Sequence, residues 1–346
     1  MRVNVALDAM GGDTGPDVAI LGALAAVRAC DDLHVILIGP EERLKARLAE
    51  LAQGDTAAQA QVSVYPASEV VTMEDMPVDA IRKKKDATVV VGFDLVKKGQ
   101  ADAMVSAGNS GAIMAAAVKK LGRLPGIARP GIASFFPTAR NRPVMIMDIG
   151  ANVDCRAQHL YQFAVMATCY VRRVLHKEHP RVGLLSIGAE TGKGNALVKE
   201  TFPLLQASPL NFAGNVEGRD VYRGDVDVVV CDGFIGNILL KASEGLGEAA
   251  LQMIRGEILK SWRARFGYLL MRGALAAFKK QVDYAEYGGA PLLGINGTGI
   301  VCHGASSAAA LCRACIVAAD MARHDINATI VGLLGEYRVE PESAAP

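Results

Sequence analysis

The sequence predicts an α/β fold, a doubly wound and mainly parallel sheet, on three observations. Short apolar strand patterns alternate with segments of helical length, and such alternation is typical of strands joined by right-handed crossovers. Hydrophobic residues make up 51% of the 346 residues and aromatic residues only 5%, which is typical of helices packed on a parallel sheet. Glycine-rich polar turns follow the strand patterns, where ligands gather in such sheets.

The individual elements follow from runs of apolar residues that end at polar turns. The strand runs are, in order, V-N-V-A-L, H-V-I-L-I, D-A-M-V-S, V-M-I-M-D, V-G-L-L-S, V-D-V-V-V-C and G-I-V-C. Between them lie segments long enough for helices. We expect strands over 3–7, 34–38, 102–106, 144–148, 182–186, 226–231 and 299–302, and helices over 16–29, 110–121, 157–176, 195–207 and 305–323.

One stretch departs from this alternation. Residues 241–282 contain no convincing strand, and residues 255–280 carry seven basic residues against one acidic residue. We expect a basic amphipathic helical protrusion at about 245–285 on one catalytic domain that spans 1–335, with 336–346 as a flexible tail. The protrusion is suited to an anionic membrane or an acidic partner, or to packing against a second subunit. Its candidate docking residues are Lys260, Trp262, Arg263 and Arg265.

Composition and missing motifs exclude several classes of function. A net charge of +1 argues against an electrostatic nucleic-acid binder. The N-terminus enters a strand pattern directly and no long apolar run follows, so we expect a cytoplasmic protein without a membrane span. The seven cysteines and six histidines are scattered, which predicts neither disulfides nor a metal site. The run G-A-E-T-G-K-G-N departs from a P-loop and no G-x-G-x-x-G fingerprint occurs, so we expect no nucleotide cofactor.

Five glycine-rich turns predict an anion site. Glycine lets the backbone approach a ligand, and helix N-termini present N–H groups with a partial positive charge. Several such turns together favour phosphate, although the same residues make tight turns and helix caps in any α/β protein. The turns span 8–13, 106–112, 148–154, 187–195 and 232–237, and the candidate phosphate-binding residues are Gly11, Gly12, Asn109, Ser110, Gly111 and Asn152.

These turns also carry a family resemblance. The motifs D-A-M-G-G-D, S-A-G-N-S-G-A, D-I-G-A-N-V-D, R-V-G-L-L-S-I-G, G-N-V-E-G-R-D, D-G-F-I-G-N, L-K-A-S-E-G, Y-G-G-A-P-L-L-G and H-G-A-S occur in this order. The series closely resembles the bacterial phosphate acyltransferase family from about residue 3 to 325. The resemblance implies reversible acyl transfer from acyl carrier protein to inorganic phosphate, which gives acyl phosphate for phospholipid synthesis. It also implies a homodimer whose fold is similar to isocitrate and isopropylmalate dehydrogenases and to phosphotransacetylases.

The resemblance places Lys193 and Asn237 at the reacting centre, and His303, at a strand-to-helix turn in C-H-G-A-S, is a third catalytic candidate. Lys193 would hold phosphate, Asn237 would donate to the carbonyl oxygen or orient the nucleophile, and His303 would protonate the leaving thiolate. Without the resemblance, Lys193 would be a solvated loop lysine, Asn237 a helix cap and His303 a cap or a dimer contact. Many relatives carry a lysine in the strand before H-G where this chain has Val301, so any role of that lysine cannot be carried over.

Acyl carrier protein is acidic, so basic surfaces are candidates for docking it. Besides the protrusion, the run R-K-K-K offers Arg82, Lys83 and Lys84, which could equally be a solvated helix end. Two other functions stay open. A decarboxylating dehydrogenase on the same fold predicts nicotinamide binding, and a membrane-associated platform for the glycerol-phosphate acyltransferase predicts that Lys193 is dispensable.

Overall fold

A single mixed sheet runs through the molecule. The computed structural model describes residues 2–282 and 287–336. Eleven strands form the sheet in the order β3-β2-β1-β4-β11-β10-β5-β6-β9-β7-β8. They are β1 (Val3–Asp8), β2 (Leu33–Gly39), β3 (Val62–Pro66), β4 (Ala103–Ser106), β5 (Gly131–Phe136), β6 (Val144–Met147), β7 (Arg181–Leu185), β8 (Asn211–Val216), β9 (Val228–Val230), β10 (Ala290–Leu293) and β11 (Gly299–Val301).

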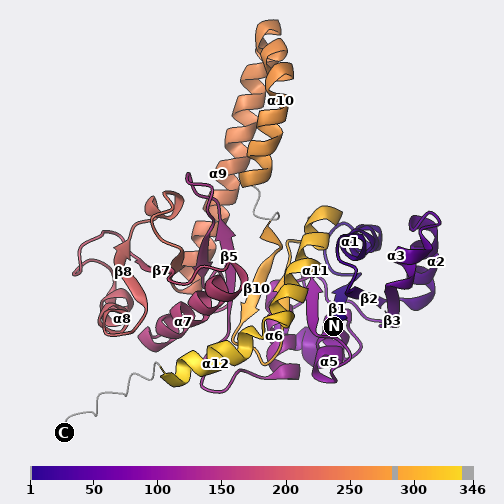
Figure 1. The fold of residues 1–346 in the computed structure, drawn as a ribbon, viewed down its shortest axis with the longest axis horizontal. Coiled ribbons are helices and arrows are strands. Elements are labelled where there is room, and N and C mark those ends of the chain that lie inside the picture. Colours follow the sequence, from indigo (N-terminus) through magenta and orange to yellow (C-terminus); the bar gives the residue numbers. More distant parts are fainter. Residues whose placement is uncertain (1, 283–286, 337–346) are drawn as a thin grey trace.

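Helices cover both faces of this sheet (Figure 1). Side chains of α1, α7, α8, α11 and α12 pack on one face, and side chains of α4, α5 and α6 pack on the other. The helices are α1 (Pro16–Ala29), α2 (Glu41–Leu51), α3 (Thr56–Ala60), α4 (Pro77–Lys83), α5 (Thr88–Lys97), α6 (Ser110–Leu121), α7 (Ala157–Val174), α8 (Ala196–Gln206), α9 (Gly233–Lys260), α10 (Trp262–Val282), α11 (Ala308–Arg323) and α12 (Ile326–Glu336).

The sheet is parallel except at its centre. Strand β10 is antiparallel to both β11 and β5, and β5 is antiparallel to β6. The strands on the two sides of this centre therefore run in opposite directions. Two pairs of turns therefore reach the middle of the sheet from its two halves. One pair follows β4 and β11, and the other follows β6 and β9. The predicted doubly wound, mainly parallel class is confirmed, and the antiparallel centre is the addition.

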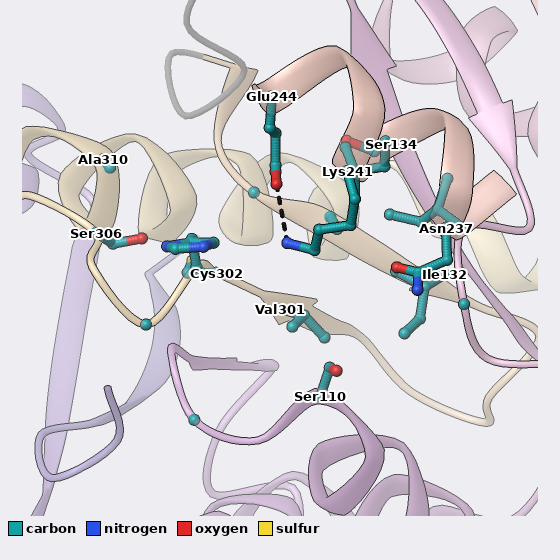
Figure 2. A pocket seen from close by; sticks show the side chains of 18 of the residues that line it. Ser110, Ile132, Ser134, Asn237, Lys241, Glu244, Val301, Cys302, Ser306 and Ala310 are labelled. Carbon is teal, nitrogen blue, oxygen red and sulfur yellow. Dashed lines mark hydrogen bonds and ion pairs between the residues drawn. The ribbon is translucent and has the colours of Figure 1, made fainter. Parts of the chain in front are cut away.

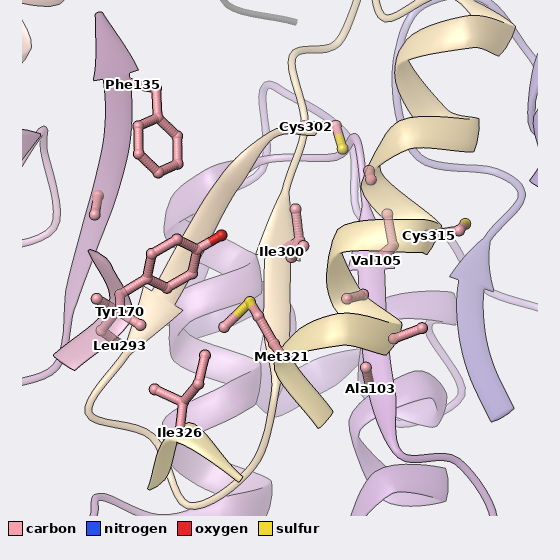
Figure 3. Close-up of a cluster of buried hydrophobic side chains, with 14 of the residues drawn as sticks. Ala103, Val105, Phe135, Tyr170, Leu293, Ile300, Cys302, Cys315, Met321 and Ile326 are labelled. Atoms are coloured by element: carbon pink, nitrogen blue, oxygen red, sulfur yellow. The ribbon is translucent and has the colours of Figure 1, made fainter. Parts of the chain in front are cut away.

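Alternation along the strands divides the core into two layers. Val5 and Leu7 of β1 face one layer, and Ala6 between them faces the other, because successive strand side chains point to opposite faces. Figure 3 shows the first layer, where Tyr170 of α7 and Met321 of α11 lie against Ile300 of β11. The strands next to the site are thus buried on both faces, which makes them a rigid support.

The predicted helical protrusion is confirmed as a hairpin of α9 and α10 (Figure 1). The two helices contact one another and project together from the body. Large apolar side chains remain exposed along them, with Leu246 72%, Met253 73%, Trp262 74% and Leu270 73% accessible. Among the described residues, no helix has the length and apolar character to cross a bilayer. The predicted tail lies, from residue 337 onward, outside the described residues.

Candidate active site

A cleft of about 510 Å³ lies over the middle of the sheet. Its size falls in the range of small-molecule sites. Most of its lining comes from five parts of the chain: the turn after β4, the turn after β11, the strand β5, the turn after β6, and the first half of α9 (Figure 2). Its lining includes Asp13, Met73, Gly108, Ser110, Ile132, Ser134, Ile149, Gly150, Asn237, Leu240, Lys241, Glu244, Val301, Cys302, His303, Gly304 and Ser306.

The cleft combines an apolar wall with a few polar groups. Ile132, Ile149, Leu240 and Val301 form the apolar part, and Figure 2 shows the hydroxyl of Ser110 directed into the cavity from the start of α6. Val301 is only 8% exposed, and as a valine it contributes no charge to this wall. An arrangement of this kind accepts a ligand that is apolar at one end and polar at the other.

Helix α9 contributes one face to the cleft. Asn237, Leu240, Lys241 and Glu244 are spaced i, i+3, i+4 and i+7, which places them on one side of a helix. Asp232 is the N-cap of this helix, and its carboxylate accepts the backbone N–H of Ile235 at 2.9 Å. Asn237 therefore lies in the second turn of the helix. It is not the helix cap, which was the alternative to a place at the reacting centre. Its amide side chain is directed toward the cleft (Figure 2).

The position of Asn237 is fixed by glycines that allow close contact. A Cβ at Gly236 would lie 1.9 Å from the carbonyl oxygen of Asp148, so the helix packs directly on the turn that follows β6. Gly150 in that turn has φ +141, and a Cβ there would lie 3.6 Å from the Asn237 amide. Other residues rarely adopt such a backbone conformation. The turn and the Asn237 amide are thereby held together.

Asp148 organises this turn from within the core. Its carboxylate accepts backbone N–H groups from Ile132 at 3.1 Å, Ala151 at 3.1 Å and Asn152 at 2.7 Å, and the side-chain N–H of Asn152 at 2.9 Å. Burial raises the pKa of the Asp148 carboxyl, and these hydrogen bonds oppose the rise. Asn152 also donates to the carbonyl of Pro130 at 2.8 Å. The structure therefore places Asn152, expected in the anion cradle, among the supports behind the cleft.

Lys241 and Glu244 form an ion pair at the cleft. The Lys241 ammonium lies 2.9 Å from a Glu244 carboxylate oxygen, and Figure 2 shows this pair facing the cavity. The Lys241 side chain is 57% exposed and that of Glu244 18%. The sequence signal for both residues was the motif L-K-A-S-E-G, which carried the resemblance but not a role.

His303 and Cys302 follow β11 at the opposite side of the cleft. The Nδ1 of His303 accepts the backbone N–H of Ala305 at 3.1 Å. A neutral imidazole with this partner carries its proton on Nε2, so His303 presents a donor there. Burial raises the pKa of the Cys302 thiol to about 12, which makes it a poor nucleophile at neutral pH.

The first glycine turn closes against the His303 turn. The N–H of Asp13 donates to the carbonyl of Gly304 at 2.8 Å, and a Cβ at Gly12 would lie 2.8 Å from the same oxygen. The N–H of Gly11 donates to the Asp8 carboxylate at 2.9 Å. Gly11 thus closes the first turn on Asp8 and Gly12 lets it approach the His303 turn, while Asp13 is the residue of this turn that lines the cleft.

The turn after β4 likewise contains one predicted residue that lines the cleft and others that support the fold behind it. Asn109 caps α6 by accepting the N–H of Ala112 at 3.1 Å, and its amide donates to the carbonyl of Met73 at 3.3 Å. A Cβ at Gly111 would lie 2.8 Å from Pro77. Of the three residues expected here, only Ser110 is among those that line the cleft.

Lys193 lies in an exposed turn between β7 and α8. Its backbone N–H donates to the carbonyl of Glu190 at 3.0 Å, and its side-chain carbons pass close to Gly188. It is not among the residues that line the cleft. A role for Lys193 in holding phosphate stays a prediction.

The candidate docking residues differ in how firmly they are held. Lys84 donates to the Asp75 carboxylate at 2.5 Å and to the carbonyl of Val70 at 2.9 Å, so its charge is used in fixing α4. Arg82 and Lys83 are exposed on the same helix. On the hairpin, the Lys260 ammonium pairs with Glu257 at 2.6 Å, the Arg265 guanidinium donates to the carbonyl of Leu259 at 2.7 Å, and the Arg263 guanidinium lies 5.6 Å from the centre of the Trp262 ring.

The described part of the chain shows no cluster of three or more histidine, cysteine, aspartate or glutamate side chains suited to a metal ion. The cleft offers amide, hydroxyl, imidazole, ammonium and carboxylate groups instead. Such groups position and polarise a substrate by hydrogen bonding and charge.

Solved structures with the same fold define the structural class. A phosphotransacetylase from Streptococcus pyogenes superposes with a TM-score of 0.62 at 18% identity, over 93% of this chain and 94% of that one. A branched-chain phosphotransacylase from Enterococcus faecalis gives 0.57 at 15% identity, over 93% of this chain and all of that one. At these identities the likeness is one of fold, that of the phosphotransacylases.

Sequence comparison identifies the family. A family model described as fatty acid synthesis protein matches residues 3–329. A phosphate acyltransferase from Pelobacter propionicus is 50% identical over 338 residues, which cover 98% of this chain and 96% of that protein. One from Trichlorobacter lovleyi is 50% identical over 334 residues, with 96% and 95% covered. This chain belongs to the phosphate acyltransferase family, as the ordered motifs predicted.

Proposed function

We propose that this protein transfers a fatty acyl group from acyl carrier protein to inorganic phosphate and releases acyl phosphate for phospholipid synthesis. The observation that carries the proposal is the geometry of the cleft: Asn237, Lys241 and His303 face one cavity that also has an apolar wall. The chain that contains this cleft belongs to the phosphate acyltransferase family. The apolar wall suits the acyl chain, and the polar groups suit phosphate and the thioester.

In the proposed reaction, an oxygen of hydrogenphosphate attacks the thioester carbonyl carbon. The new C–O bond gives a tetrahedral oxyanion, and the C–S bond then breaks to release the pantetheine sulfur. The proton of hydrogenphosphate ends on that sulfur, so atoms and charge balance without a covalent enzyme intermediate. Because phosphate is already a nucleophile, the protein contributes alignment and charge stabilisation.

Asn237 is proposed to act on the oxyanion, and His303 is proposed to act on the leaving pantetheine sulfur. The Asn237 amide donates to the oxyanion, and loss of one such donor typically costs about 3 kcal/mol of barrier. The Nε2–H of His303 donates to the developing thiolate, a role supported by the hydrogen bond that Nδ1 accepts from Ala305. Lys193 remains a proposed phosphate ligand by resemblance alone.

Mass spectrometry of acyl phosphate and free carrier protein tests this function. Purified protein is mixed with palmitoyl carrier protein and phosphate, beside a palmitoyl-CoA control and the variants Asn237→Ala and Lys193→Ala. Phosphate-dependent product that falls about 100-fold in Asn237→Ala supports the reaction. Absence of product with folded wild-type protein would overturn it, and full activity of Lys193→Ala would remove that residue from the mechanism.

The hairpin is proposed to serve association. Its exposed apolar residues, such as Trp262 and Phe266, lie among arginines and lysines, a combination that suits an anionic membrane. The same face suits a second copy of the chain, and we propose a peripherally membrane-associated homodimer that delivers acyl phosphate to the membrane glycerol-phosphate acyltransferase. Vesicle flotation with anionic and neutral lipids, together with sedimentation of Trp262→Asp, tests this; equal flotation of wild type and variant would refute the membrane contact.

A further inference from the structure

The cleft has an electrostatic problem if phosphate is to bind in it. Among the described lining residues, Asp13 and Glu244 are carboxylates, while Lys241 is the one lysine and no arginine occurs. A phosphate dianion that leaves water needs hydrogen-bond donors and compensating positive charge. The two basic side chains of this lining are Lys241 and His303, and lysine is the stronger base of the two. The requirement for a cation therefore falls first on Lys241.

The geometry of Lys241 suits that requirement. Figure 2 shows its ammonium in the open part of the cavity, between the side of α9 and the turn after β11. A lysine ammonium has three N–H donors. The contact with Glu244 at 2.9 Å uses one direction, and the side chain remains 57% exposed. The other donors can therefore meet a phosphate oxygen without breaking the ion pair.

Glu244 restrains the lysine. The glutamate side chain is 18% exposed and is thus the more firmly enclosed member of the pair. A flexible lysine loses conformational freedom when it binds a ligand, and a partner that already orients it reduces this loss. Glu244 also partly neutralises Lys241, which lowers the attraction that a product anion must overcome on leaving.

The helix turn that carries the pair is fixed to the body. The Ser243 hydroxyl donates to the carbonyl of Leu239 at 2.6 Å, and it also hydrogen-bonds the hydroxyl of Tyr222. Tyr222 in turn packs edge-on against Phe136 of β5, with ring centres 6.4 Å apart. The ammonium is therefore presented from an anchored helix, which gives more precise positioning than a loop.

We infer that Lys241 is the cation that binds the phosphate substrate and that Glu244 is its positioning residue. The inference rests on the proposed function, since it assigns the phosphate subsite of that reaction. It distinguishes Lys241, on the cleft wall, from Lys193, in the exposed turn before α8.

Steady-state kinetics with phosphate varied at saturating palmitoyl carrier protein test the inference. We expect Lys241→Gln to raise the KM for phosphate about tenfold with a smaller effect on kcat, because a charge-assisted hydrogen bond from a half-exposed lysine is lost. Lys241→Arg, which keeps the charge, should restore most of the affinity. Lys45→Gln is the matched control, because Lys45 is 56% exposed and pairs with Glu41 on α2, away from the cleft.

A double-mutant cycle tests Glu244. Glu244→Gln should raise the phosphate KM in the wild-type background and leave it unchanged in the Lys241→Gln background, because its effect passes through the lysine. Equal effects in both backgrounds would overturn the positioning role. Thermal unfolding of each variant shows whether the fold is retained.

Calorimetric titration with inorganic phosphate separates this inference from the proposed function. Phosphate binding that Lys241→Gln weakens supports the subsite even if wild-type protein shows no acyl transfer. Wild-type turnover with an unchanged phosphate KM and unchanged binding in Lys241→Gln would overturn the inference alone. Loss of binding in Lys45→Gln as well would show a general charge effect and would also overturn it.

Discussion

Replacing Asp148 by asparagine tests whether a buried carboxylate supports the site. In the structure one carboxylate oxygen faces the backbone N–H of Asn152 at 2.7 Å and its side-chain N–H at 2.9 Å. An asparagine can keep the bonds of the other oxygen, to Ile132 and Ala151 at 3.1 Å, but it turns an NH₂ group toward two donors. Two hydrogen bonds to a charged acceptor are lost in a fully buried site.

The size of the effect follows from those two bonds. Hydrogen bonds to charged groups contribute about 1.5–3 kcal/mol each. Replacing the buried charge by a neutral amide also removes its desolvation cost, which offsets part of the loss. We expect Asp148→Asn to lower the free energy of unfolding by about 3 kcal/mol. Because Gly150 and Asn237 rest on the same turn, acyl transfer should fall even at temperatures where the variant stays folded.

Urea unfolding measures the first effect, with an unchanged m-value showing that the same surface is exposed. Asp154→Asn is the control, since Asp154 is exposed on the same turn and surface substitutions usually change stability by less than about 0.5 kcal/mol. A loss below about 1 kcal/mol in Asp148→Asn, or an equal loss in Asp154→Asn, would refute the reasoning.

Three further predictions concern other buried positions. Burial lowers the pKa of His159 below its ordinary 6.5, so as pH drops the unfolded chain binds the proton before the folded chain does, and the free energy of unfolding falls below about pH 6.5. His159→Gln should reduce the slope of that fall when unfolding is measured from pH 7 to 5. An unchanged slope would contradict this prediction. Cys302→Ala should retain acyl transfer, and intact-protein mass spectrometry should find no acyl thioester at Cys302, because its thiol has a pKa of about 12; an acyl adduct there would overturn the direct mechanism. Gly236→Ala should destabilise the fold by more than about 3 kcal/mol, since its Cβ would lie 1.9 Å from the Asp148 carbonyl oxygen, whereas Gly245→Ala, with open space around it, should not; equal stability of the two variants in urea unfolding would refute the packing argument.

Local sequence signals were sufficient for much of the fold. The helices expected over 16–29 and 110–121 have those bounds in the structure, because proline at the first position and Asn109 as a cap define their starts. The hairpin was visible as a basic stretch without strands. These signals depend only on neighbouring residues, so a single sequence contains them.

The centre of the sheet could not be predicted in this way. Strand β5, G-I-A-S-F-F, and strand β10, A-P-L-L, are short and carry glycine, proline or alanine, which reduce a strand signal. Each strand is antiparallel to a neighbour close in sequence, β6 or β11, but their pairing with one another joins segments more than 150 residues apart, as between Ile132 and Leu292. Such pairing is a tertiary property that no local pattern contains.

The site was predicted in part for the same reason. Asn237, Ser110 and His303 line the cleft, whereas Asn109, Asn152 and the two glycines of the first turn support it from behind. Glycine and asparagine look alike in a sequence whether they contact a ligand or close a turn. The sequence assigns Lys241 no place in the site, because a lysine on an exposed helix is usually only solvated and its position at the cleft depends on which side of α9 meets the sheet.

Helix α9 has one further consequence, which concerns the mechanics of the molecule. Its 28 residues make a rod of about 42 Å at ~1.5 Å per residue, with the cleft residues at one end and the exposed hairpin at the other. Directly after Glu244 the rod contains Gly245 and Gly247, and no atom of the described residues lies within 4 Å of a Cβ at either position. Glycine within a helix costs about 1 kcal/mol relative to alanine, so the rod is weakest at this junction. A bend there would change the direction of the hairpin while the cleft end keeps its alignment with the sheet.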